Sequence, residues 1–218
     1  MFIGHFGVAF AAKKIVPNVS LGTLFLSVEF LDLIWPIFLL LGWEHVRIVH
    51  GITKVSPFDF YDYPISHSLL GVFAWSLAFA GIYFALLGRR RAAIVLGIAV
   101  ASHWLLDLVT HRPDLPLWPG GPKVGLGLWN SWAASISIEA LLFGVGLLVY
   151  VRHTEAWDSI GRYAFWALAA FLLLGWVGSL VAGAPPNTTA LAWGGLMLWL
   201  IVPWGWWVDS HRKARQRI

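Results

Sequence analysis

Six apolar stretches of membrane-spanning length dominate this sequence of 218 residues and leave it few possible folds. A helix needs about 20 predominantly apolar residues to cross the hydrocarbon core of a bilayer. Only 12% of the residues are charged, against about 25% in an average soluble domain. Backbone groups in lipid must be hydrogen-bonded internally, so we expect an all-α, polytopic transmembrane bundle. The predicted spans are Ser20–Gly42, Pro64–Gly88, Arg91–His111, Ser131–Val151, Gly161–Ala182 and Ala190–Val208.

A shorter apolar helix, Phe2–Lys13, precedes the first span and is too short to cross a bilayer unaided. It is predicted either as a half-helix inside the bundle or as a helix at the membrane interface. Pro36 is expected to kink the first span, because proline removes a helical hydrogen bond. The whole chain, 1–218, is predicted to be one membrane domain. Residues 1–111 carry the candidate metal site, and residues 112–218 supply supporting helices and a basic tail.

Positive charges are divided unevenly between the two sets of loops. One side of the predicted bundle carries eleven Lys and Arg residues and the other carries four. The positive-inside rule places the richer side in the cytoplasm. We therefore predict a multi-pass protein of the cell inner membrane with a cytoplasmic C-terminus. The loops Trp43–Tyr63 and Arg112–Asn130 then face outward, where they form a lid over a site or pack against the span ends.

Three polar side chains interrupt the third span at a spacing of four residues: His103, Asp107 and His111. This spacing is just over one helical turn, so all three project from one face of the helix. Insertion scales assign a charged group at the centre of a bilayer a cost of roughly 2.5–3.5 kcal/mol. A cluster of such groups predicts a functional site.

Other acidic and histidine side chains fall at a similar depth when each helical residue is counted as about 1.5 Å of rise. The complete set lies between the middle and the outer surface of the membrane and comprises His5, Glu29, Asp32, His67, His103, Asp107, His111 and Glu139. No Lys or Arg lies deep in the spans to compensate the carboxylates. We therefore predict a bound divalent metal ion, which unpaired carboxylates and imidazoles at this depth would need.

The ligand types narrow the choice of ion. The chain has no cysteine, so the ligands must be nitrogen and oxygen atoms. Such a site suits Zn first, with Mn or Fe as alternatives. Taken alone, His5 could be an interfacial residue and His111 could simply meet water at the end of its span. Glu29 and Glu139 are predicted as candidate general bases; Glu29 could instead orient a ligand, and Glu139 could join two helices.

Four short motifs follow one another in the first half of the chain. They are Gly4-His5, Leu31-Asp32, Ser66-His67-Ser68-Leu69-Leu70 and the segment Ser102–Thr110. This order resembles that of the bacterial membrane-bound metal-dependent hydrolases. The resemblance implies hydrolysis and a ligand set of His5, Asp32, His67, His103 and Asp107. The family motif Pro-Asp-x-Asp-His is incomplete here, because the chain keeps Asp32 and lacks the second Asp and the His.

Three functions are compatible with these residues. The first is a metal-dependent hydrolase that acts on a lipid-linked or amphipathic ester or phosphoester from the outer half of the bilayer. The second is transport of a metal ion or proton through the same polar groups. The third is a non-catalytic scaffold stabilised by a metal ion. The expected partner is a membrane lipid or lipid-linked substrate, and no nucleic-acid partner is expected because the sequence carries no motif for one.

Overall fold

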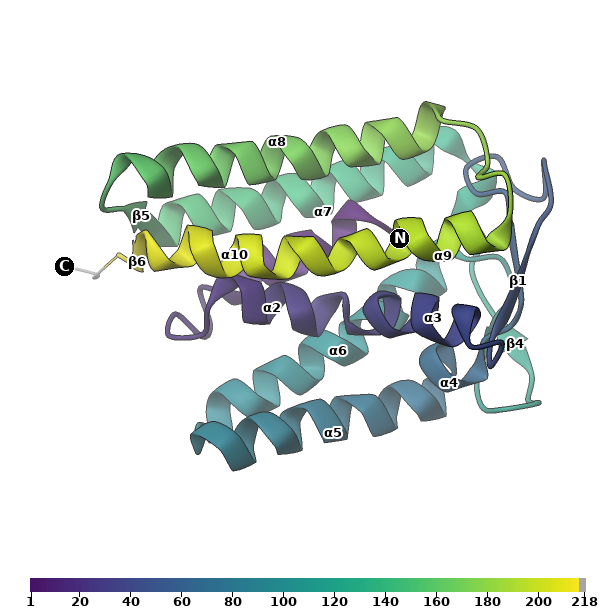
Figure 1. Ribbon diagram of the computed structural model, residues 1–218, viewed down its shortest axis with the longest axis horizontal. Helices are drawn as coiled ribbons and strands as arrows, with labels where there is room; N and C mark the ends of the chain where they lie inside the picture. The colour runs from purple at the N-terminus through teal and green to yellow at the C-terminus, as the bar shows by residue number, and fades with distance from the viewer. Residues whose placement is uncertain (216–218) are drawn as a thin grey trace.

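The computed structural model describes residues 1–215 and confirms the predicted helical membrane bundle (Figure 1). Within the described residues, five helical segments are long and apolar enough to cross a membrane, and a bent pair of helices adds a sixth. The helices are α1 (Ile3–Ala12), α2 (Leu21–Val28), α3 (Phe30–Leu40), α4 (Pro64–His67), α5 (Leu69–Leu87), α6 (Arg90–Thr110), α7 (Trp132–His153), α8 (Ser159–Val181), α9 (Thr188–Leu196) and α10 (Ile201–Ser210), with 3₁₀ turns η1 (Leu128–Asn130) and η2 (Met197–Leu200).

The outward faces of the long helices are apolar. On α5, the large side chains of Phe73, Leu77 and Leu86 are all mostly exposed. A contiguous apolar surface of this extent is not stable in water and marks a membrane-facing or interaction surface. The lipid bilayer therefore supplies the surroundings that these side chains need.

Three short antiparallel strand pairs lie at the two ends of the bundle. β1 (His45–Ile48) pairs with β2 (Phe58–Asp62), and β3 (Leu115–Pro116) pairs with β4 (Lys123–Val124). We call the end that carries these strands the hairpin end (Figure 1). β5 (Thr154–Ala156) pairs with β6 (Arg212–Ala214) at the opposite end, which we call the basic end. The cytoplasmic location of the C-terminus stays a prediction.

Helix α1 lies inside the bundle rather than on its surface, and most of its residues are buried. It packs against α7 through two glycines that let the backbones touch. A Cβ atom added to Gly146 would collide with the carbonyl oxygen of Gly7. Any side chain at this position would push the two helices apart. Of the two predictions for this helix, the structure therefore shows the one in which it packs within the bundle.

Two predicted spans are broken at positions that their sequences did not indicate. The first span bends by 55° at Glu29, between α2 and α3, whereas the kink was expected at Pro36, which lies inside the continuous helix α3. The second span is interrupted at Ser68, which has an extended backbone and caps α5 by accepting a hydrogen bond from the Gly71 N–H. Both breaks lie beside residues of the predicted site.

Aromatic rings fill the interior between the hairpin end and the basic end. The ring of Phe10 lies 5.2 Å from Phe25, 5.9 Å from Phe143, 5.4 Å from Tyr150 and 6.1 Å from Phe165, measured between centroids. Edge-to-face contacts at such distances are favourable for aromatic pairs. This aromatic layer separates the polar residues of the hairpin half from the basic end.

Candidate functional site

The carboxylate of Asp107 is surrounded by four imidazole rings. Its Oδ2 atom lies 3.1 Å from Nε2 of His103 and 4.0 Å from Nε2 of His67. Its Oδ1 atom lies 3.2 Å from Nε2 of His5 and 3.9 Å from Nε2 of His111. All five side chains are buried. The predicted ligands on α1, α4 and α6 therefore meet at one point in the hairpin half of the bundle.

Asp32 on α3 completes the Oδ2 side of this arrangement. Its Oδ1 atom lies 3.3 Å from Nε2 of His67 and 3.7 Å from Nε2 of His103. Ligand atoms held at 2.0–2.2 Å around a tetrahedral zinc ion are about 3.3–3.6 Å apart. The four distances among Asp32, His67, His103 and Asp107, from 3.1 to 4.0 Å, bracket this spacing. These four donors match the geometry of a divalent metal site.

A hydrogen-bonded chain fixes the proton of His67. The Ser66 hydroxyl lies 2.6 Å from Oε2 of Glu44 and 2.6 Å from Nδ1 of His67. An ionised carboxylate can only accept, so the Ser66 hydroxyl donates its hydrogen bond to Glu44. It must then accept a hydrogen bond from the Nδ1–H group of His67. The lone pair of His67 is then on Nε2, which faces Asp32. Glu44 also accepts the backbone N–H groups of Ile65 and Ser66 at 2.7 Å each, which anchors α4.

The bend between α2 and α3 fixes the proton of His103. Nδ1 of His103 lies 2.7 Å from the carbonyl oxygen of Val28, the last residue of α2. A carbonyl can only accept, so Nδ1 carries the proton and Nε2 carries the lone pair. The break at Glu29 thus leaves a backbone carbonyl for His103, and this hydrogen bond stabilises the bend between α2 and α3.

A third imidazole, that of His111, is oriented by a carboxylate outside the cluster. Nδ1 of His111 donates to Oδ1 of Asp114 at 2.9 Å, which leaves its Nε2 facing Asp107. The hydroxyl of Tyr63 lies 3.4 Å from the same Asp114 oxygen. Burial, and then the charge of Asp114, raises the pKa of Tyr63 well above its ordinary value, so this hydroxyl stays a neutral donor. Metal-binding histidines commonly show such a carboxylate partner on the second ring nitrogen.

These assignments bring acceptors face to face with acceptors. The Nε2 lone pairs of His67, His103 and His111 point toward carboxylate oxygens that can only accept as well. Such a buried arrangement is unfavourable unless a cation lies between the groups or a ring takes up a second proton. The site is therefore built to hold positive charge.

His5 takes part through stacking and through its own contact with Asp107. Its ring lies parallel to that of His103, with the centroids 3.8 Å apart and an interplanar angle of 2°. Within the described residues, its Nδ1 atom has no hydrogen-bond partner. The α-amino group of Met1 lies 2.5 Å from Oδ1 of Asp107, the oxygen that His5 also faces.

The two glutamates predicted as general bases occupy different surroundings. Glu29 is 2% exposed, and neither of its carboxylate oxygens finds a hydrogen-bond partner in residues 1–215. Oε2 of Glu139 accepts the backbone N–H of Phe2 at 2.8 Å and so caps the start of α1. Glu139 also lines a large cavity beside the cluster, whereas Glu29 is outside the lining of that cavity.

This cavity has a volume of about 1020 Å³. On the site side it is lined by Asp32, His67, Asp107 and His111. Its far wall is formed by apolar side chains of α8, α9 and η2 that include Trp176, Leu180, Leu191 and Leu198. The volume is at the upper end of the range typical of small-molecule sites, about 300–1,000 Å³.

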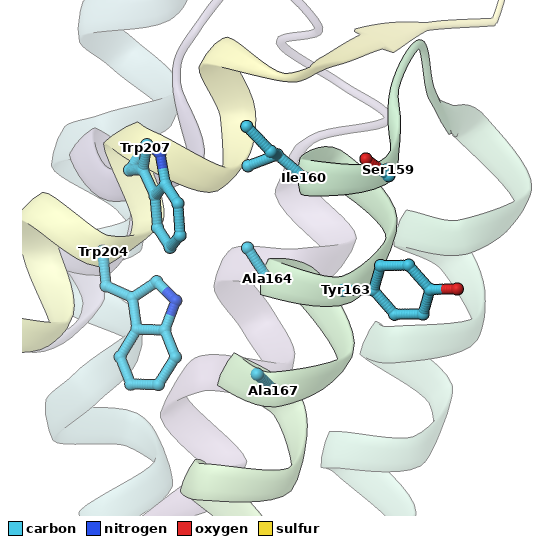
Figure 2. Close-up of a pocket in the computed structure, with 7 residues that line it drawn as sticks. All are labelled: Ser159, Ile160, Tyr163, Ala164, Ala167, Trp204 and Trp207. Carbon is cyan, nitrogen blue, oxygen red and sulfur yellow. The ribbon is translucent and has the colours of Figure 1, made fainter.

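A second, smaller cavity of about 350 Å³ lies between α8 and α10 (Figure 2). Figure 2 shows the indole rings of Trp204 and Trp207 on one side and the small side chains of α8, among them Ala164, on the other. It has no His, Asp or Glu in its lining, so it offers none of the donors found around Asp107.

Two residues that hold the site in place were missed in the sequence. Glu44 and Asp114 are both buried and orient His67 and His111. Asp114 could have been recognised, because it follows His111 by three residues in a rigid Pro-containing turn. Glu44 carried no such signal, because its partner Ser66 is 22 residues away and the hairpin β1–β2 joins them.

Comparison with protein-family models corrects the family suggested by the motifs. The model described as the YdjM inner membrane protein matches residues 64–185. The resemblance to the bacterial membrane-bound metal-dependent hydrolases is therefore wrong as a statement of family. Of the four motifs behind it, only Ser66–Leu70 and Ser102–Thr110 lie within the matched segment.

Comparison with the curated proteins and with the solved structures finds no match. The family match nevertheless covers more than half of the chain, and the helices have the length and hydropathy of membrane spans. This chain is a multi-pass membrane protein and belongs to the YdjM inner membrane protein family.

Proposed function

We propose that Asp32, His67, His103 and Asp107 bind a divalent metal ion and that the chain is a metal-dependent hydrolase of an amphipathic ester or phosphoester. The observation that carries this proposal is the orientation of the imidazoles, whose Nε2 lone pairs are turned toward carboxylates by Ser66 and Val28. Zinc fits best because the donor spacing is near tetrahedral, and Mn or Fe would accept the same nitrogen and oxygen atoms.

The metal donors lie beside a large cavity, which favours a catalytic role over a purely structural one. A bound divalent ion supplies Lewis acidity, activating a water molecule and stabilising charge on a phosphoryl or acyl oxygen. Asp32, His67 and Asp107 line the large cavity, so a substrate can approach the donors directly. Structural zinc sites are normally closed on all sides.

Glu139 is the better candidate for the proton acceptor. It lines the cavity, and Oε2 is held by the backbone N–H of Phe2, which fixes the position of the carboxylate. The other oxygen, Oε1, is then available to take a proton from an attacking water. Glu29 is outside the cavity lining, so we assign it a supporting electrostatic role behind His103.

The lining of the cavity indicates an amphipathic substrate. Thr53, Lys54 and Ser56 in the β1–β2 hairpin provide polar groups at one end, including a cation that suits a phosphate or carboxylate. Trp176 and Leu198 form an apolar part of the cavity wall. A molecule with an anionic head and an alkyl chain matches both parts.

Transport is the weaker alternative, because the path toward the basic end is filled. The aromatic layer around Phe10 lies between the metal donors and that end, and its side chains are buried. A transported ion would need polar groups through this layer. Flux of Mn²⁺ into vesicles that contain the purified chain would favour transport and contradict the hydrolase.

The proposal is tested with purified protein and defined probes. We would assay a long-chain alkyl phosphomonoester and a long-chain umbelliferyl ester, with short-chain analogues for comparison. Activity should require added Zn²⁺ or Mn²⁺, disappear with a chelator and favour the long-chain probes. Glu139→Gln should keep the bound metal and lower turnover by about 10²–10⁴-fold, the usual contribution of a general base.

The decisive variant is His103→Ala combined with Asp107→Ala. It should lose both bound metal and hydrolysis, whereas a His45→Ala control, in the exposed β1–β2 hairpin, should keep both. The proposal is overturned if the double variant keeps its metal content and its activity. It is also overturned if neither probe class is cleaved by metal-loaded wild-type protein.

A further inference from the structure

The large cavity beside the metal donors opens to the surface of the protein at two places. At the hairpin end, the lining residues Gly51 and Lys54 are exposed. A second group of exposed lining residues belongs to α8, to α9 and to the loop that joins them, and comprises Ser179, Ala182, Gly183 and Gly194. The cavity therefore runs from the hairpin end to an opening between α8 and α9, the two helices joined by a loop in Figure 1.

The opening between α8 and α9 has apolar surroundings. Val181, Trp193 and Met197 beside it are all mostly exposed. The segment Thr188–Ser210 has the length and hydropathy of a membrane span. Leu198, which lines the cavity, comes ten residues after the start of this segment, so the cavity extends about 15 Å along the span. An opening with this depth and these neighbours faces the hydrocarbon of a bilayer.

Two adjacent glycines on α9 differ in what surrounds them. A Cβ atom added to Gly195 would lie 2.7 Å from Cγ of Pro36, so the absence of a side chain lets α9 pack closely against α3. A Cβ atom added to Gly194 would meet no atom within 4 Å, and Gly194 lines the cavity. Glycine inside a helix lowers its stability relative to alanine. Gly194 therefore leaves space that the packing of the helices does not use.

We propose that the opening between α8 and α9 admits the alkyl chain of an anionic amphiphile from the bilayer, and that Gly194 keeps the space for this chain. This inference rests on the proposed function and deepens it, because it names the residue that selects the length of the substrate chain. Trp176 and Leu198 form the apolar wall against which the chain packs. Burial of methylene groups against such a wall is favourable.

The charge of the lining directs the head group to the other opening. Among the described residues, Lys54 is the only Lys or Arg that lines the cavity, and it lies at the hairpin end. An ammonium group forms strong hydrogen bonds with a phosphate or carboxylate. The anionic head is then held near Lys54 while the chain extends between α8 and α9. Asp32 and His67 line the same cavity, so the bond that joins head and chain can reach the metal donors.

Photolabelling tests the position of the chain without depending on hydrolysis. The purified full chain in phospholipid nanodiscs is irradiated with a hexadecyl phosphonate that carries a diazirine on its alkyl chain. Peptide mass spectrometry should place most of the label in residues 176–198 and little in α5, whose apolar face is also exposed. Excess unlabelled hexadecyl phosphonate should remove the label from residues 176–198. Equal labelling of the two segments, without competition, would overturn the inference.

Variants test the role of Gly194 in selecting chain length. Gly194→Leu should weaken hexadecyl phosphonate binding about tenfold, the effect of losing about two buried methylene groups, and leave butyl phosphonate binding unchanged. Gly81→Leu on α5 is the matched control, because a Cβ atom there also meets nothing within 4 Å and Gly81 is outside the cavity lining. Lys54→Gln should weaken the binding of both phosphonates. Unchanged affinity for hexadecyl phosphonate in Gly194→Leu would overturn the inference.

The same proteins separate this inference from the proposed hydrolase. Hydrolysis of the long-chain probes at equal rates by wild type and Gly194→Leu would overturn the chain site and leave the hydrolase standing. Specific labelling of residues 176–198 without hydrolysis of any probe would overturn the hydrolase and leave a cavity that binds an amphiphile.

Discussion

The two ends of α1 bury charge in opposite ways. At the basic end, Lys13 donates to Oδ2 of Asp209 at 2.6 Å and to the carbonyl of Val19 at 2.7 Å. The hydroxyl of Tyr150 donates to the other oxygen of Asp209 at 3.1 Å. At the hairpin end, His5 joins a cluster in which carboxylates and imidazole lone pairs face one another.

The difference lies in whether donors and acceptors match. The Lys13 cluster contains one cation and one anion, and its hydrogen bonds run from donors to acceptors. The Asp107 cluster contains atoms without partners among residues 1–215, including Nε2 of His103 and both oxygens of Glu29. A bundle that builds a satisfied cluster at one end of a helix has no stability reason to leave the other unsatisfied. We infer that the first cluster stabilises the fold and that the second serves function.

Lys13→Met should lower the stability of the fold by more than removal of a bound metal ion does. It leaves the Asp209 carboxylate buried without its counter-ion, which typically costs about 3–5 kcal/mol. The free energy of unfolding in detergent micelles or bicelles would measure the effect. Lys13→Met combined with Asp209→Leu removes both charges and should recover most of the loss. A double variant as unstable as the single one would show that Lys13 acts through packing. The contrast between the Lys13 cluster and the Asp107 cluster would then not rest on charge pairing.

Metal removal should act only on the hairpin end. A ligand that binds the folded state stabilises it by about 2.7 kcal/mol when its free concentration is about 100-fold above Kd. A chelator should therefore lower the Tm of wild-type protein and leave the Tm of His103→Ala unchanged. Lys13→Met should show the same chelator-dependent difference as wild type. An equal response in His103→Ala and wild type would contradict the assignment of the two clusters.

Ser66→Ala should weaken metal binding without removing a ligand. It breaks the link from Glu44 to Nδ1 of His67, so the imidazole is no longer held in one tautomer. Loss of such a supporting hydrogen bond usually lowers metal affinity about 10–100-fold, or about 1.4–2.7 kcal/mol. Calorimetric titration with Zn²⁺ would measure it. Ser102→Ala is the matched control, since Ser102 also precedes a histidine but bonds only the Ala99 carbonyl.

The spans could be predicted from the sequence because a lipid environment imposes a length and an apolar composition on each helix. The break at Glu29 could not, because it involves a partner far along the chain, whereas the break at Ser68 rests on a local cap in which the Ser68 hydroxyl accepts from the Gly71 N–H. Val28 bends away from helical bonding to meet His103, which is 75 residues later. Neither Val28 nor His103 is a residue type that marks the end of a helix. Pro36 was expected to bend its helix on local grounds, but the bend lies at Glu29, where the Val28 carbonyl meets His103.

The candidate residues could be grouped from depth alone, because each position in a helix fixes a height in the membrane. That reasoning placed His5, His67 and His103 near Asp107 without a structure. It could not supply the tautomers, which depend on Ser66, Val28 and Asp114. It could not tell Glu139, which lines the cavity, from Glu29, which does not. Those distinctions rest on which way a side chain points.

The ion pair of Asp158 and His211 at the basic end is partly exposed to solvent, in contrast to the buried pair of Lys13 and Asp209. Asp158 caps α8 by accepting the Gly161 N–H at 2.7 Å and also accepts from Nδ1 of His211 at 2.6 Å. The bond from Gly161, and then the one from His211, lowers the pKa of Asp158 below its ordinary value. Folding therefore favours the carboxylate. The resulting stabilisation is present above the ordinary pKa of an aspartate and is lost as pH falls through the lowered pKa.

Asp158→Asn should abolish this pH dependence while keeping a side chain that caps helices well. The difference in Tm between wild type and variant should be small at neutral pH and should vanish once Asp158 is protonated. Its size should be far below that of Lys13→Met, since solvent screens an exposed pair. If the two changes were equally costly, burial would not be what sets the energy of these charge pairs. The contrast between the satisfied and unsatisfied clusters would then lose its physical basis.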